Sequence, residues 1–321
     1  MSSELKKWIE PRRVQKDSFT SRGLGIIAKD LIKIYKIGRG IEVQALRGVS
    51  LKVSPGEAVC IMGPSGSGKT TLLNMIGGVD YPTGGQVIVG NIVVNELPES
   101  LLEKYRLGVI GYMFQAFNLI PVLSALENIA VPMIAFGVPR EIRAARAKWL
   151  LEQVGLSHRA HHKPAELSGG EQQRVAIAVA LANDPPVILA DEPTAELDTE
   201  NALRIIDLLV GLSRKHGKTI IVSTHDPRIA VRTDRILRLE DGKVKGTYRP
   251  TDLGLGVMEA GKGVDVAEVL KNKLASTEKE LEELVARYAR REIGFEEFDH
   301  EYNRLRTIIH GIRELLSSMG H

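Results

Sequence analysis

The sequence predicts an α/β fold with a mainly parallel central sheet, and three short apolar segments carry this prediction. They run from Glu57 to Gly63, from Val187 to Glu192 and from Thr219 to Ser223. The continuously apolar part of the second run is typical of a central parallel strand that is covered on both faces. With 321 residues, the chain exceeds one typical domain, and a parallel core with a smaller second unit fits better than two equal domains.

The first 23 residues are rich in basic side chains and show no apolar periodicity. Lysines and arginines there outnumber acidic residues by six to three. We therefore expect residues 1–23 to form a solvated, flexible N-terminal arm, with contact to anionic lipid as the alternative. The net charge of the whole chain is only +3, which gives no reason to expect a nucleic-acid partner.

The remaining elements are expected in the following order. Residues 24–53 are predicted to form strands around glycine turns, and residues 86–94 a β hairpin broken at Gly90 and Asn91. Residues 118–182 are predicted to be mainly helical, including a helix from Arg140 to Val154. The single cysteine, Cys60, lies within the first apolar strand, so we interpret it as a small buried hydrophobic residue.

A complete phosphate-binding loop motif, GPSGSGKT, extends from Gly63 to Thr70. A strand precedes it and a segment with helical spacing follows it, so the loop is expected at a helix N-terminus, where free N–H groups favour anions. Lys69 is expected to reach the β- and γ-phosphates of a triphosphate, and the Thr70 hydroxyl to ligate Mg²⁺. The predicted nucleotide-binding residues here are Gly63, Pro64, Ser65, Gly66, Ser67, Gly68, Lys69, Thr70 and Thr71.

Two carboxylates, Asp191 and Glu192, end the second apolar strand. In open α/β sheets, ligands bind at the carboxyl ends of the strands. Asp191 is therefore predicted to hold Mg²⁺ through water, and Glu192 to act as the base or the positioner for the attacking water. A plain acidic pair at the surface is the alternative, and the glycine loop in the same chain argues against it.

A third motif, LSGGEQQR, runs from Leu167 to Arg174 between the two halves of this site. Together the three motifs resemble those of the ATP-binding subunit of an ABC transporter, over about residues 25–247. The resemblance implies a P-loop NTPase of ABC type, with a mainly parallel core sheet, an antiparallel β flap and a helical subdomain. We expect this ABC ATPase domain to span residues 24–249 and to use ATP and Mg²⁺ as cofactors.

The same resemblance implies roles for three further residues. His225, after the third apolar strand, matches the switch histidine that contacts the γ-phosphate. Gln115, in GYMFQ, matches the glutamine that senses Mg²⁺ and water, and Tyr35 matches the aromatic residue on which adenine stacks. The alternatives are a structural histidine, an ordinary polar loop residue and a half-buried strand tyrosine.

Ser168, Gly169 and Gly170 have the polar, glycine-rich composition of a second anion-binding helix start. In the family this signature serves the ATP that is bound to the partner subunit, and Asp198 matches the loop residue that crosses to the other site. The resemblance therefore implies a head-to-tail homodimer with two ATP molecules between the subunits.

The sequences of several segments, including GYMFQAFNLIPVLSALENIAVP, resemble those of the macrolide-exporter and lipoprotein-release branch of the family, which also includes the cell-division ATPase. Members of this branch pair with a separately encoded integral membrane permease. The expected function is thus an ATP-hydrolysing subunit that dimerises on ATP and powers such a permease, which exports or extracts a substrate. A nucleotide-gated clamp that transmits force to a cell-envelope or division complex is the alternative. The apolar residues expected to dock the permease are Phe117, Leu119, Ile120 and Leu123, although core packing explains some of them equally well.

The longest apolar run, residues 129–138, is interrupted by Pro132 and is far shorter than the roughly 20 residues that span a bilayer. We therefore expect a peripheral protein, held by the permease at the cytoplasmic face of the membrane.

The chain departs from the family pattern in two places. It has Ala195 and Glu196 where the branch usually has Gly-Asn. Residues 250–263 are glycine-rich and are predicted to be a linker, and residues 264–321 to be a C-terminal helical extension of two amphipathic helices that turn near Gly294. Packing on the ATPase domain is one interpretation of this extension, and dimerisation or regulation is the other.

Overall fold

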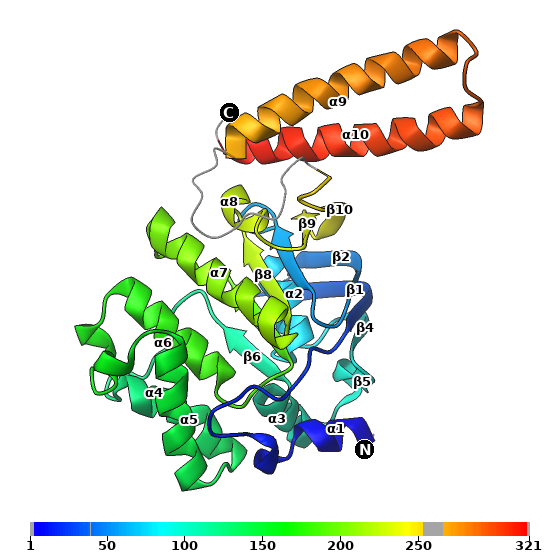
Figure 1. The fold of residues 1–321 in the computed structure, drawn as a ribbon. Helices are drawn as coiled ribbons and strands as arrows, with labels where there is room; N and C mark the ends of the chain where they lie inside the picture. Colours follow the sequence, from blue (N-terminus) through cyan, green and yellow to red (C-terminus); the bar gives the residue numbers. More distant parts are fainter. Residues whose placement is uncertain (1–2, 39, 253–265, 320–321) are drawn as a thin grey trace.

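The computed structural model describes residues 3–38, 40–252 and 266–319. A six-stranded sheet in the order β10-β9-β3-β8-β7-β6 forms its centre (Figure 1). Strands β9, β3, β8, β7 and β6 are mutually parallel, and β10 pairs antiparallel with β9. The strand bounds are β3 Ala58–Met62, β6 Ile110–Met113, β7 Val187–Asp191, β8 Thr219–Thr224, β9 Arg235–Glu240 and β10 Lys243–Tyr248.

The three apolar segments recognised in the sequence are the central strands β3, β7 and β8. Every residue in these three strands is buried, as expected for parallel strands covered by helices on both faces. Cys60 lies within β3 and is buried as predicted, and burial raises the pKa of its thiol. The predicted parallel core is therefore confirmed.

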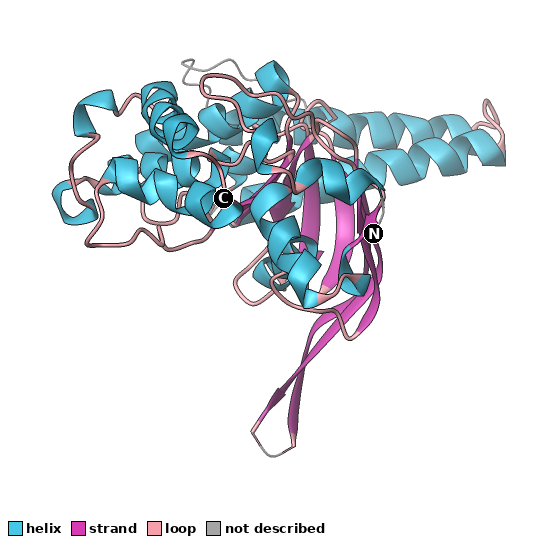
Figure 2. Cartoon of the chain, turned by 90° about the horizontal axis from the view of Figure 1, so that it is seen from below, coloured by secondary structure: helices cyan, strands magenta, loops and turns pink. Residues whose placement is uncertain are grey.

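A second, antiparallel sheet has the strand order β2-β1-β4-β5. Figure 2 shows β1 and β2 extending together as a long ribbon beyond the helices. The antiparallel flap and the short hairpin at Gly90 and Asn91 thus agree with the sequence prediction. The strand bounds are β1 Ile26–Ile37, β2 Ile41–Val53, β4 Gly84–Val89 and β5 Ile92–Val93.

Three helices, α4, α5 and α6, form the helical subdomain beside the parallel sheet (Figure 1). Ser124 and Ser168 begin α4 and α6 with capping boxes, in which the serine side chain and a glutamate three residues later exchange hydrogen bonds with the backbone. The helix bounds in the body of the protein are α2 Lys69–Gly77, α3 Glu99–Gly108, α4 Ala125–Phe136, α5 Arg140–Gln153, α6 Gly169–Leu181, α7 Thr199–His216 and α8 Pro227–Ala230.

The N-terminal segment is packed against the body, so the prediction of a solvated arm is wrong. Its first helix, α1 (Ser3–Trp8), buries Leu5 and Trp8. Further along, Arg13 donates hydrogen bonds to the carbonyl oxygens of Gly108 and Asp184. The sequence did not reveal this docking because the segment is rich in charged residues. Its two buried apolar side chains, Leu5 and Trp8, are one helical turn apart, which is too short a stretch to show a periodicity.

The loop before β7 binds the N-terminal segment through one buried carboxylate. The carboxylate of Asp184 is buried, and it accepts hydrogen bonds from the backbone N–H groups of Thr20 and Ser21 and from the Thr20 hydroxyl. Lys218, also fully buried, donates to the other carboxylate oxygen. A buried charge needs such partners, and the N-terminal segment provides most of them.

The C-terminal helices α9 (Val266–Ala289) and α10 (Phe295–Ser318) form an antiparallel hairpin that turns at residues 290–294, as predicted. The base of the hairpin packs on the body in one apolar cluster with Tyr248, Ile236 and Val231. Glu314 also forms an ion pair with Arg238 of β9 at 2.6 Å. Most of the predicted linker, residues 253–263, lies outside the described residues.

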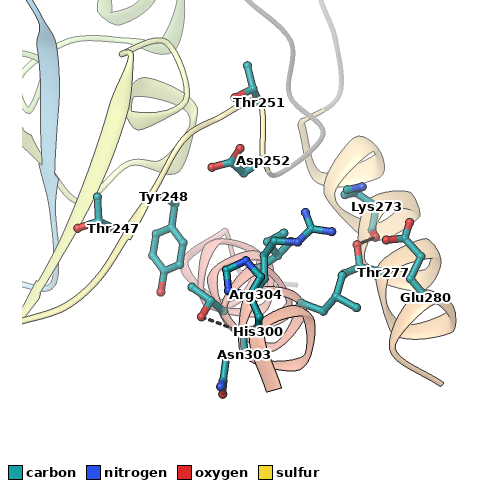
Figure 3. Close-up of a pocket in the computed structure, with 13 residues that line it drawn as sticks. Thr247, Tyr248, Thr251, Asp252, Lys273, Thr277, Glu280, His300, Asn303 and Arg304 are labelled. Carbon is teal, nitrogen blue, oxygen red and sulfur yellow. Dashed lines mark hydrogen bonds between the residues drawn. The ribbon is translucent and has the colours of Figure 1, made fainter. Parts of the chain in front are cut away.

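A cavity of about 640 Å³ lies where the hairpin meets the end of β10 (Figure 3). Its wall includes Tyr248 from β10 and Arg304 from α10, and Thr277 of α9 donates its hydroxyl to the Lys273 carbonyl there, at 2.8 Å. Among the described residues, no helix combines the length and the apolar composition needed to cross a membrane.

Candidate nucleotide site

The phosphate-binding loop connects β3 to α2, and tight packing requires glycine at positions 63 and 68. A Cβ atom on Gly63 would lie 2.0 Å from the Leu239 carbonyl oxygen, and one on Gly68 would lie 2.6 Å from the Ala45 carbonyl oxygen. Gly68 also has a φ of 103°, in the left-handed region that favours glycine. The backbone therefore follows a path that other residues would obstruct, and it ends at the N-terminus of α2.

Lys69, the first residue of α2, folds back over this loop. Its ammonium group donates hydrogen bonds to the carbonyl oxygens of Gly63 and Pro64, at 2.8 and 3.1 Å. It also lies 3.2 Å from the Glu192 carboxylate. A bound phosphate would compete for the same ammonium protons, because the lysine side chain has three donors in total.

Glu192 follows β7 directly and contacts the residues on both sides of it. One carboxylate oxygen faces Lys69, and the other lies 3.0 Å from Nδ1 of His225, which follows β8. The backbone of Glu192 has a φ of 45°, an uncommon conformation for a residue with a side chain, and its N–H donates to both the carbonyl and the hydroxyl of Ser223. The end of β7 thus aims this carboxylate at the loop.

Asp191 is the last residue of β7 and is buried, with its Oδ1 accepting a 2.6 Å hydrogen bond from the Ser223 hydroxyl. Burial, with a contribution from the charge of Asp191, raises the pKa of the neighbouring Tyr112. Gln115 lies exposed just after β6, and Thr70 lies exposed in the first turn of α2. Because β3, β6, β7 and β8 are parallel neighbours, these polar side chains all follow the same edge of the sheet.

The donor set formed by Thr70, Gln115 and Asp191 suits a hard cation such as Mg²⁺, which takes oxygen ligands and usually retains several waters. Within the described ranges, no group of three or more His, Cys, Asp or Glu side chains is placed to hold a metal. A cation here would therefore depend on a hydroxyl, an amide, one carboxylate and the phosphate oxygens. This composition is typical of sites that bind the metal together with a nucleotide.

Tyr35 of β1 lies near the start of α2. Its hydroxyl donates a 2.9 Å hydrogen bond to Asp80 and is also close to Thr71. Lys33 places its ammonium group 4.8 Å from the centre of the Tyr35 ring, so one face of the half-buried ring meets a cation. Its role in stacking on adenine stays a prediction.

The signature residues lie in a different place from the phosphate-binding loop. Ser168 is the exposed N-cap of α6, and its hydroxyl accepts a 3.3 Å hydrogen bond from the Glu171 N–H. A Cβ on Gly169 would lie 3.6 Å from the Glu196 carbonyl oxygen, so the signature borders the loop that ends at Asp198. Asp198 is itself the exposed N-cap of α7. No hydrogen bond or ion pair in the described part of the chain joins residues 168–170 to residues 63–70.

The four residues expected to dock a permease do not share one environment. Leu119 packs against the apolar core of the helical subdomain, whereas 39% of Ile120 is exposed. Sequence reasoning missed Val122, of which 72% is exposed, and Phe114, of which 41% is exposed. A pattern of apolar residues in a loop does not distinguish those that point inwards from those that point outwards.

A hollow of about 230 Å³ lies beside this loop, between the end of α2, β6 and the helical subdomain. Tyr112 and Phe114, on its wall, stack with their ring centres 4.4 Å apart. Val79 and Leu107 also line it. The surface next to Gln115 is therefore apolar and concave.

The fold and the site together define a P-loop nucleotide-binding protein with a second, glycine-rich helix start whose N-cap, Ser168, is exposed. Comparison with known proteins assigns the family: the ABC transporter family model matches residues 46–195. The chain belongs to the ABC transporter family of ATP-binding proteins and is an ATPase.

Curated relatives and solved structures support this assignment. The chain is 46% identical over 219 residues to the lipoprotein-releasing system ATP-binding protein LolD of Syntrophus aciditrophicus, which covers 68% of this chain and 98% of that protein. It is 45% identical over 216 residues to the macrolide export ATP-binding/permease protein MacB of Hyphomonas neptunium, over 67% of this chain and 33% of that one. A dimeric structure of the Methanocaldococcus jannaschii cassette MJ0796 with ADP and Pi is 47% identical, with a TM-score of 0.66, covering 70% of this chain and 98% of that one.

Proposed function

We propose that two copies of this ATPase close head to tail on ATP and power a separately encoded membrane permease that exports or extracts a substrate. The exposed helix start at Ser168 and Gly169 carries this proposal. The first N–H groups of a helix have no partner within the helix and favour anions. Since no described contact links this helix start to the loop at residues 63–70, the nucleotide of a second copy is its natural ligand.

The MJ0796 structure, a dimer of a related cassette with ADP and Pi, supports the association of two copies. In the proposed dimer each nucleotide lies between the loop at residues 63–71 of one copy and residues 168–170 of the other. Asp198, beside the signature, lies near the boundary between the copies. The dimer closes on ATP because the γ-phosphate then gains contacts from both copies, and hydrolysis removes them.

Each residue of the site has its own role in the proposed reaction. Lys69 leaves Glu192 and binds the phosphate oxygens, and Tyr35 supports the adenine ring. Mg²⁺, held by Thr70, Asp191 and Gln115, would neutralise charge on the phosphates.

Release from Lys69 makes the Glu192 carboxylate available to accept a proton from water. His225 remains within hydrogen-bond distance of Glu192 and donates towards the γ-phosphate. The water oxygen then bonds to the γ-phosphorus, the bond to the bridging oxygen breaks, and ADP and phosphate leave. This reaction needs positioning and charge stabilisation and no covalent enzyme intermediate.

The apolar surface beside Gln115 is the proposed dock for the permease. Phe114 lines this surface, and Ile120 and Val122, in the loop that follows it, also expose apolar side chains, as is typical of interaction sites. The relatives LolD and MacB are described as parts of lipoprotein release and macrolide export, which supports a membrane partner. The chain would then lie at the cytoplasmic face of the membrane, held there by the permease.

A mixing experiment tests the head-to-tail arrangement. Ser168→Arg protein and Lys69→Ala protein are each expected to be inactive, because each variant damages both sites of its homodimer. A mixed dimer has one site with Ser168 and Lys69 both intact. An equal mixture should therefore recover up to about one quarter of wild-type ATPase activity, because half of the dimers are mixed and each has one intact site of two.

The matched control mixes Ser168→Arg protein with the double variant Ser168→Arg/Lys69→Ala, in which no dimer has an intact site. No activity should return there. Recovery in both mixtures, or in neither although crosslinking detects mixed dimers, would contradict action of Ser168 in trans.

A further inference from the structure

The distal half of the C-terminal hairpin is stabilised by an apolar core of its own. Leu284 of α9, Leu305 of α10 and Ile293 of the turn are buried together, and Figure 1 shows this half of the hairpin projecting away from the body. It therefore needs no support from the body along this length, and its flanks remain open to another molecule.

One flank is hollowed between the two helices, with a volume of about 510 Å³. Leu281 and Ile309 form its apolar floor. We call this surface the hairpin groove; its walls are Glu278 and Glu282 from α9 and Arg306, His310 and Arg313 from α10.

The charges of the hairpin groove are separated by helix. Both acidic side chains belong to α9 and lie four residues apart, and all the basic ones belong to α10, so each helix presents a row of one sign along the groove. The guanidinium of Arg313 and the carboxylate of Glu278 form a 2.6 Å ion pair across the groove. Because the helices are antiparallel, that pair places Glu282 level with the stretch between Arg306 and His310.

Glu282 and Arg306 make no ion pair within the described residues. Both are exposed, with Arg306 lying over the ring of Tyr302 at 5.7 Å. A surface with rows of opposite sign around an apolar floor does not suit a partner of uniform charge. An anionic membrane or a nucleic acid would meet the acidic row, and an acidic or basic peptide would meet one row of its own sign.

The partner that fits both rows is a second copy of the same groove. A two-fold axis parallel to the helices places α9 of one copy over α10 of the other, so each acidic row meets a basic row and the two apolar floors come together. A two-fold axis perpendicular to the helices would instead place α9 over α9, with like charges opposed. We propose that two copies of this chain associate through their hairpin grooves about the parallel axis, without any need for nucleotide.

This contact goes beyond the ATP-dependent dimer of the proposed function, because it involves none of the residues that bind nucleotide. It would keep two ATPase subunits together in the part of the cycle in which ATP no longer bridges them. Its charge pairs are exposed at the edges, so the association should weaken as the salt concentration rises.

The test uses the full-length chain without nucleotide, followed by sedimentation velocity over a range of micromolar concentrations. The wild type should form dimers. Glu282→Arg and Arg306→Glu should each raise the dimer dissociation constant by about tenfold or more, because every dimer then contains two repulsive contacts in place of two attractive ones.

An equal mixture of the two variants should form dimers again. In a mixed dimer, the new arginine at position 282 faces the new glutamate at position 306, and the native Glu282 faces the native Arg306. Recovery in the mixture also shows that both variants are folded. Glu283→Arg, the same charge change one residue further along α9 and outside the groove, is the matched control and should dimerise like the wild type.

Three results would overturn the proposal. A wild-type chain that stays monomeric without nucleotide at all concentrations tested would do so. So would an equal loss of association in Glu283→Arg and Glu282→Arg, or a mixture of the two groove variants that associates no better than either one alone. None of these outcomes depends on ATP, so the proposal stands or falls separately from the head-to-tail dimer.

Discussion

Lys69 and Glu192 form an ion pair at 3.2 Å between the phosphate-binding loop and the end of β7, and both side chains are largely buried. The cation that is expected to bind phosphate and the carboxylate that is expected to activate water are therefore paired with each other. In the proposed reaction, nucleotide binding separates them, because the phosphate oxygens take over the ammonium group of Lys69. The ammonium group thus exchanges one anionic partner for another, and Glu192 keeps the contact between its second carboxylate oxygen and His225.

This exchange predicts opposite behaviour for the two residues. Glu192→Gln should bind ATP at least as well as the wild type, because Lys69 no longer has a competing carboxylate, but its hydrolysis rate should fall by about 10² to 10⁴. Lys69→Ala should lose binding itself. Equilibrium binding of labelled ATP and single-turnover hydrolysis separate the two effects, and unchanged turnover in Glu192→Gln would remove this residue from the mechanism.

The proposed permease dock predicts a difference between residues that are close neighbours in the sequence. Replacing Ile120 and Val122 together with Asp should leave folding and basal ATPase activity intact, because both side chains are exposed. Stimulation by the co-reconstituted permease should disappear. Leu119→Asp is the contrasting variant and should lose stability, since Leu119 packs against the core of the helical subdomain. If the double variant keeps full stimulation, the dock lies elsewhere.

The buried pair of Asp184 and Lys218 predicts a large effect on stability. Asp184→Asn leaves the buried ammonium of Lys218 without a counter-charge, and breaking a buried pair in this way typically costs about 3 to 5 kcal/mol. Urea unfolding should show this loss. The double variant Asp184→Asn/Lys218→Met should recover part of it, because it removes both charges. A loss in the single variant below about 1 kcal/mol would mean that the pair is solvated in solution.

The same pair predicts how this effect depends on pH. Burial alone would raise the pKa of Asp184, but Lys218 and the N–H groups of Ser21 and Thr20 lower it below its ordinary value of 3.8. A lowered folded-state pKa contributes stability above that ordinary value, and this stability is lost as the pH falls through the folded-state pKa. The stability difference between the wild type and Asp184→Asn should shrink below about pH 4. A difference that stays flat down to about pH 3 would contradict the lowered pKa.

The junction between the hairpin and the body predicts an unusual response at Gly311. Glycine to alanine in a helix ordinarily stabilises it by roughly 0.5 to 1 kcal/mol. Here the added Cβ would lie 2.6 Å from the Tyr248 ring, so Gly311→Ala should destabilise the junction, by about 1 to 3 kcal/mol if the ring cannot move. Differential scanning calorimetry should detect the change. Adding Tyr248→Ala should remove the clash and reverse its sign, whereas Gly294→Ala, at a position with open space around it, should produce no clash at all.

Much of the fold could be predicted from local patterns. The central strands β3, β7 and β8 are continuously apolar because both of their faces are covered, and the hairpin helices show their buried stripes at intervals of three and four residues. The docked N-terminal segment could not be predicted in this way. Its contacts reach Asp184 across more than 160 residues, and its sequence resembles that of a solvated, charged segment.

In the candidate site, too, local patterns predict some features and tertiary packing determines the others. Its residue types and their spacing determined by themselves where a phosphate loop, an acidic strand end and a second helix start would occur, because each of these is a local backbone feature with local chemical requirements. Only the tertiary structure decided that Glu192 pairs with both Lys69 and His225, that Leu119 faces inwards while Val122 faces solvent, and that the hairpin places an acidic row beside a basic one. These relationships depend on how separate elements pack together, and packing joins residues that no local pattern connects.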